Sequence, residues 1–117
     1  MTRNASLLIF TFAGLLTAGP VLADEELTPA LRSSLESLGQ LNGQALACQQ
    51  MALSSRLRTI LIEEAPKERS VGEAFEQATQ AAYLAQGKGQ ACPDSKALAK
   101  RIDAAAGELR HALGSAH

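Results

Sequence analysis

Aromatic and strand-forming residues are scarce in this chain of 117 residues. It has no tryptophan, one tyrosine and three phenylalanines, so aromatic residues make up only 3% of the sequence. Nowhere in residues 24–117 do polar and apolar residues alternate as they do in a half-buried strand. Alanine, leucine, glutamine, glutamate, lysine and arginine, which all favour helices, dominate instead. The composition therefore excludes a β-rich fold and predicts an all-α protein.

Histidine is equally scarce, and the motifs of the common catalytic and cofactor sites are missing. The only histidines are His111 and His117, both near the end of the chain. The sequence has no CxxC, no CxxCH and no Cys-His set with zinc spacing. Met51 and His111 lie too far apart in the expected helices to bind one haem iron. We therefore expect neither an enzyme nor a cofactor, and we assign no catalytic residue.

One helical motif approaches a metal-ligand set. Glu108 and His111 form a Glu-x-x-His pair, which places a carboxylate and an imidazole on one helical face, as in dimetal helical bundles. Those bundles need a second copy of the motif, which this sequence lacks. We expect no metal site, and the nearest candidates for ligands are Glu108, His111 and His117.

The chain has no strong charge of either sign. Lysine and arginine together number 11 and aspartate and glutamate 12, which leaves a formal net charge of −1. A balanced chain has no electrostatic reason to bind nucleic acid or an anionic membrane. We expect neither as a partner.

Long apolar runs are confined to the N-terminus. Residues 1–23 carry one arginine, a short apolar run, a Gly-Pro break and small residues at the end, which is the pattern of a secretory signal peptide. We therefore expect cleavage before Asp24 and a periplasmic, or extracellular, protein with one domain in residues 24–117. The apolar run is shorter than the roughly 20 residues that span a bilayer. An uncleaved anchor is thus the less favoured alternative, and we expect no stable membrane insertion after cleavage.

The only two cysteines, Cys48 and Cys92, both lie in the part expected to be exported. Oxidising compartments allow disulfides to form and persist, and an even count leaves no orphan thiol. A domain of this size buries a small share of its surface, so a cross-link is expected to help it fold. We predict a Cys48–Cys92 disulfide.

Helix signals divide residues 24–117 into four helices. The break between the first two is inferred from a phase shift in the apolar stripe, because no glycine or proline marks it. The expected helices run from a Thr28 cap and Pro29 to about residue 48, from about residue 52 to Ala65, from a Ser70–Glu73 capping box to about Gln86, and from an Asp94 or Ser95 cap through Leu113.

Four helices with short connections favour a small up-and-down bundle in which chain neighbours pack antiparallel. Cys48 lies at the junction of the first and second helices, and Cys92 at the junction of the third and fourth. In an up-and-down bundle these two junctions fall at the same end. The helix pattern and the predicted disulfide therefore agree.

A row of small residues runs along the first expected helix. Gly39, Gly43 and Ala47 recur every four residues, and Asn42 interrupts the neighbouring leucine stripe. Small residues at this spacing let another helix approach closely. A single polar residue in an apolar seam can also fix register or oligomeric state. The row is explained either by tight packing inside the bundle or by a partner or self-association surface, and both alternatives stay open.

These observations predict a non-enzymatic exported protein that binds other proteins, such as an accessory subunit or a chaperone-like binder. Its binding surface would be the small-residue row or the apolar residues between Leu53 and Ile62. The second hypothesis is a carrier of a small apolar ligand or a metal inside the bundle. It rests on large leucine and isoleucine side chains opposite glycine and alanine, which could leave a cavity.

Overall fold

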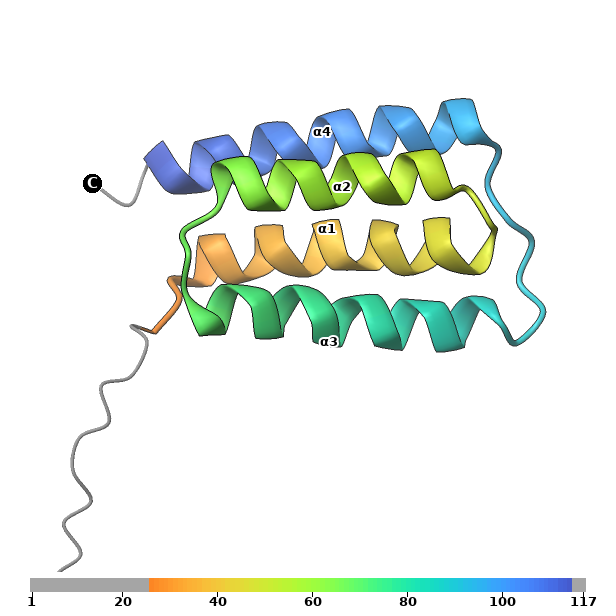
Figure 1. Cartoon of the computed structure of the whole chain (residues 1–117), viewed down its shortest axis with the longest axis horizontal. Coiled ribbons are helices and arrows are strands. Elements are labelled where there is room, and N and C mark those ends of the chain that lie inside the picture. The colour runs from red at the N-terminus through yellow and green to blue at the C-terminus, as the bar shows by residue number, and fades with distance from the viewer. Residues whose placement is uncertain (1–25, 115–117) are drawn as a thin grey trace, which may run out of the picture.

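Figure 1 shows the computed structural model of the chain, which describes residues 26–114. These residues form four helices and no strand, and the helices run in alternating directions (Figure 1). The prediction of an all-α up-and-down bundle is confirmed, whereas the predicted signal peptide lies outside the described residues. The helices are α1 (Pro29–Ala47), α2 (Met51–Glu64), α3 (Arg69–Gln86) and α4 (Ser95–Gly114).

A single apolar core lies between the helices, and all four contribute to it. The leucine stripe of α1 and the Leu98-to-Leu109 stripe of α4 are both buried, as their spacing predicts. No helix among residues 26–114 is long and apolar enough to cross a membrane. The largest fully buried side chains are Phe75, Leu35, Leu38, Leu57, Leu98, Ile102, Leu109 and Asn42.

The α1–α2 turn has the geometry of a glycine-ended helix although it contains no glycine. Gln49 has a φ of 59°, in the left-handed region. The Gln50 N–H donates to the Ala45 carbonyl at 2.8 Å, and the Gln49 N–H donates to the Leu46 carbonyl at 3.2 Å. These two bonds define the Schellman ending of a helix. The predicted break is confirmed, and Gln49 is the residue that makes it.

Replacing Gln49 by glycine should stabilise the protein. A side chain in the left-handed region costs about 1–2 kcal/mol, whereas glycine adopts this conformation freely but loses about 0.5–1 kcal/mol more backbone entropy on folding. We expect Gln49→Gly to raise the free energy of unfolding by about 0.5–1 kcal/mol, measured by urea denaturation. Gln49→Ala keeps a Cβ and should bring no gain. Equal stabilities of the glycine and alanine variants would contradict the left-handed assignment.

The start of α3 differs from the prediction. Glu68 is the N-cap, and its side chain makes no capping hydrogen bond. The Glu68 carbonyl already accepts the N–H of Val71 at 3.1 Å, so helical bonding is established before Ser70. The predicted Ser70–Glu73 capping box is therefore wrong, because Ser70 lies inside the helix.

Side-chain caps do begin α1 and α4, as predicted. Thr28 Oγ1 accepts the Leu31 N–H at 3.1 Å, with Pro29 in the first turn. Asp94 Oδ1 accepts the Ala97 N–H at 2.8 Å. Both helices thus begin where their sequence signals place them.

α1 is the central helix, and the backbone of α3 comes close to that of α1 alone. The backbone of α1 lies close to those of α2, α3 and α4, and α2 lies close to α4. No Cα atom of α3 lies within 8 Å of one in α2 or α4. Figure 1 shows α3 at one edge of the bundle, beside α1 and running in the same direction. The expected antiparallel packing of chain neighbours therefore holds for α1 and α2 but neither for α2 and α3 nor for α3 and α4.

The predicted disulfide joins the two helix connections at one end of the bundle. Cys48 and Cys92 have a Sγ–Sγ distance of 2.01 Å and are separated by 44 residues in the sequence. The Gln50 side-chain amide donates to the Pro93 carbonyl at 2.9 Å beside this bond. The α1–α2 turn and the α3–α4 connection are thus held together by a covalent bond and a hydrogen bond.

Candidate functional site

The glycines of α1 are the reason that α3 packs so closely against it. A Cβ built on Gly39 would lie 2.7 Å from the Ala78 Cβ, and one on Gly43 would lie 2.3 Å from the Thr79 carbonyl oxygen and 2.7 Å from the Ala82 Cβ. Cβ atoms do not approach other atoms this closely. Any side chain at these positions would push the two helices apart. The space opposite the glycines is filled by α3, so this row leaves no cavity.

A buried polar network fixes the register of the three helices that meet at Asn42. Asn42 is fully buried, accepts a hydrogen bond from Ser54 Oγ of α2 at 2.7 Å and donates one to Thr79 Oγ1 of α3 at 3.2 Å. The Thr79 hydroxyl in turn donates to the Phe75 carbonyl at 2.8 Å. A buried amide is stabilising only when it is bonded, so this network favours one register of α2 and α3 on α1.

The residues first considered for a partner surface therefore lie largely inside the molecule. Gly39, Asn42 and Gly43 are buried between helices, and Ala47 is half-buried. They leave no surface for a partner, because α3 already occupies it. Of the two alternatives for the small-residue row, tight internal packing describes these three buried residues.

The apolar stretch of α2 is also mostly core. Leu57 and Ile60 are buried, and Leu53 and Leu61 are half-buried against the core. Only Ile62, which is 63% exposed, has most of its surface in solvent. This stretch offers a partner one large apolar side chain rather than a surface.

A different surface is left open beside α3, whose backbone comes within 8 Å of that of α1 alone. Along the side of α3 that faces away from α2, alanines border a shallow groove whose other wall is the polar outer side of α1. The opposite side of α3 is acidic and polar, with Glu73, Glu76 and Gln80. The alanine groove is lined by Arg32, Ser33, Glu36, Ser37, Gln40, Ala74, Gln77, Ala78, Ala81, Ala82 and Ala85.

A second groove continues this surface onto α4. Ser33 of α1 lines both grooves, so they are adjacent. We call the two grooves together the open face. Small residues again predominate on the α4 side, where a Cβ on Gly107 would meet no atom within 4 Å. The second groove is lined by Ala30, Ser33, Ser34, Ala104, Gly107, Glu108, His111 and Ala112.

The residues nearest to a metal-ligand set lie at the edge of the open face. Glu108 and His111 are exposed and line the same groove of α4, as their spacing predicts. His117 lies outside the described residues. Within residues 26–114 no group of three or more His, Cys, Asp or Glu side chains is placed to hold a metal ion.

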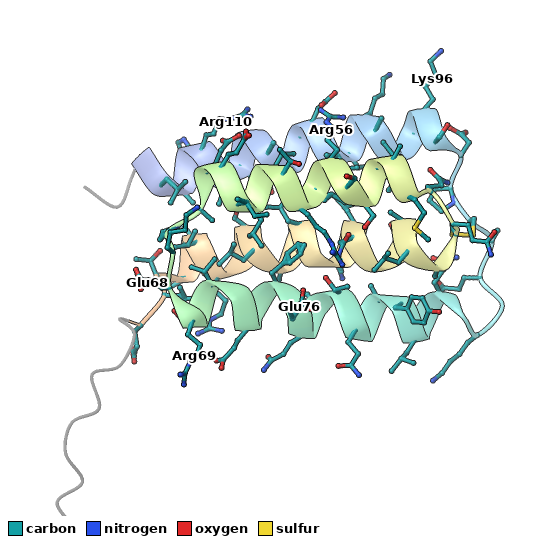
Figure 2. All side chains as sticks on the ribbon, in the orientation of Figure 1. Arg56, Glu68, Arg69, Glu76, Lys96 and Arg110 are labelled. Atoms are coloured by element: carbon teal, nitrogen blue, oxygen red, sulfur yellow. A yellow bond between two sulfur atoms is a disulfide. The ribbon has the colours of Figure 1, made fainter. Side chains whose placement is uncertain are left out.

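Charged pairs close the opposite side of the bundle, between α2 and α4. Arg56 forms an ion pair with Asp103, and Arg110 binds Glu64 through two hydrogen bonds, Nε to Oε1 at 2.7 Å and Nη2 to Oε2 at 3.0 Å. Figure 2 shows Arg56 and Arg110 along this α2–α4 side. The hydrogen bonds from Arg110, followed by its charge, lower the pKa of Glu64 below its ordinary value of 4.5, while burial opposes this. The same pair raises the pKa of Arg110.

This pair predicts a small dependence of stability on acid pH. A carboxylate whose pKa is lower in the folded state stabilises the fold above its unfolded pKa, near 4.5, and loses that contribution as the pH falls through its folded pKa. Glu64→Gln should therefore be less stable than the parent chain at neutral pH but not under strongly acidic conditions. Because the pair is exposed to solvent, we expect a far smaller loss than that on removing the disulfide. Urea titrations of both proteins across this range measure it, and a difference that does not change with pH would contradict it.

Sequence reasoning missed the open face although its signal was present. Ala74, Ala78, Ala81 and Ala85 recur at spacings of four, three and four, which places them on one side of a helix. This stripe lies next to the core stripe of α3. The sequence pattern alone therefore does not distinguish the two stripes. A helix with two adjacent small or apolar stripes can pack on two sides, and here only one side is covered.

Comparison of the chain with protein-family models, with curated proteins and with solved structures found no match.

Proposed function

We propose that this chain is an exported, non-enzymatic protein that binds another protein through its open face. The observation that carries the proposal is the position of α3, whose backbone comes close to that of α1 alone and whose alanine-lined side borders an open groove. Small residues on a rigid helix let a partner helix approach closely. The groove has the length of several helical turns, which suits an amphipathic helix lying along it.

Export is supported by the N-terminal pattern and by the disulfide. Residues 1–23 have the pattern of a signal peptide. The Cys48–Cys92 disulfide is expected to be stable in an oxidising compartment. The protein recovered from the periplasm of its own host should begin at Asp24, as intact mass measurement can establish. A chain that retains residues 1–23 in the membrane fraction would contradict export by cleavage.

Site-specific cross-linking tests the binding surface. A photoreactive amino acid replaces Ala81, which is exposed in the open face, or Thr59, which is exposed on α2 outside it. After illumination in cells of the source organism, the probe at position 81 should form a discrete protein adduct and the probe at position 59 should not. Equal adducts at both positions, or none at position 81, would overturn the proposal. Circular dichroism of each variant establishes that it is folded.

A further inference from the structure

Two opposite charges lie on the open-face side of α4, two helical turns apart. Arg101 and Glu108 are both exposed, and neither forms an ion pair within residues 26–114. Seven residues correspond to nearly two full turns, so the two side chains point in similar directions about 10 Å apart along the helix. Ala104 lies between them and lines the open face.

This arrangement is complementary to itself. If two α4 helices pack antiparallel about a two-fold axis near Ala104, Arg101 of each copy faces Glu108 of the other. Both pairs form at once, which is the property of an isologous interface. Ala104 at the axis is small enough for the two helices to approach closely.

The floor of the same groove contains a polar group that lacks a partner. Ser34 is only 3% exposed, lines the α1–α4 groove, and its hydroxyl has no hydrogen-bond partner among the described residues. Buried hydroxyls are normally hydrogen-bonded, so an unpaired one is unusual.

We infer that a second copy of this chain occupies the α1–α4 groove of the open face, docked through antiparallel α4 helices with two reciprocal Arg101–Glu108 pairs. This inference rests on the proposed function, since it names the partner for one part of the same surface. The net charge of the chain is close to zero, so two copies do not repel each other at long range. Exposed pairs are screened by salt, so the dimer should weaken as ionic strength rises.

Charge reversal tests the inference in the mature protein, residues 24–117. In sedimentation equilibrium we expect a monomer–dimer equilibrium for the parent chain. Arg101→Glu and Glu108→Arg should each weaken dimerisation by about tenfold or more, because each replaces two attractive contacts with two repulsive ones. An equimolar mixture of the two variants should dimerise again, because the mixed dimer has one original pair and one pair with its signs exchanged, both attractive.

Matched controls separate this effect from a general change of charge. Arg58→Glu and Glu63→Arg make the same charge changes at exposed positions of α2 and should leave dimerisation unchanged. Three outcomes would each overturn the inference. The parent chain could stay monomeric at high concentration, the Arg101→Glu and Glu108→Arg variants could dimerise as tightly as the controls, or their mixture could fail to dimerise. A monomeric chain whose Ala81 probe still traps a different protein would retain the proposed function and reject only self-association.

Discussion

Replacing Gly43 by alanine should destabilise the protein by about 2–3 kcal/mol, more than almost any other single methyl group added to it. The added Cβ would lie 2.3 Å from the Thr79 carbonyl oxygen and 2.7 Å from the Tyr83 nitrogen. Both are backbone atoms of α3, so no side-chain rotation relieves the clash. The helices must separate, which also stretches the hydrogen bond between Asn42 and Thr79.

Gly72→Ala is the matched control, because it lies in the same pair of helices but faces open space. A Cβ there would meet no atom within 4 Å. Since alanine favours helix more than glycine does, this variant should gain up to about 1 kcal/mol. Urea denaturation of the oxidised proteins measures both changes. Similar effects of Gly43→Ala and Gly72→Ala would contradict the close approach of α3 to α1.

Loss of the disulfide should have the largest effect on stability. A bond that closes a loop of 44 residues removes enough entropy from the unfolded chain to contribute about 4 kcal/mol. Small domains have total stabilities of about 5–15 kcal/mol, so this is a large share. We expect Cys48→Ser, Cys92→Ser and the double variant to lose similar amounts of unfolding free energy.

Reduction provides an independent check on the same bond. The parent chain treated with a thiol reductant should unfold at the same urea concentration as the double serine variant. Because the cystine ties the α1–α2 turn to the α3–α4 connection, hydrogen exchange should increase most at that end of the bundle. An unfolding midpoint unaffected by reduction would contradict a structural role for the disulfide.

The sequence was sufficient to predict the helices and the end at which the cysteines meet. The reason is that helix caps and the 3.6-residue stripe are local signals, and Thr28, Asp94 and the leucines of α4 follow them closely. Ser70 and Glu73 mimic a local signal as well, but backbone bonding from Glu68 begins the helix first. Gln49 is the opposite case. A left-handed helix ending forms there although the sequence lacks the glycine that usually signals one.

The arrangement of the helices could not be predicted from local signals. Gly39 and Gly43 showed that some helix comes close to α1, but nothing in their spacing said whether that helix belonged to the same chain. The partner is α3 because Ala78 and Ala82 present small residues at the matching four-residue spacing. With α3 in this position, none of its Cα atoms lies within 8 Å of one in α4. The surface of α1 between α3 and α4 is therefore left open.

The central claim is that the backbone of α3 comes close to that of α1 alone and that the alanine side of α3 is left open for a partner. Nuclear Overhauser contacts in a dilute, monomeric sample of residues 24–117 test it most directly. We predict contacts between the Gly43 α-protons and the Ala82 methyl group, and none from the Ala81 or Ala85 methyl groups to α2 or α4. Contacts within the monomer between those two methyl groups and α4 would show a closed bundle and contradict the claim.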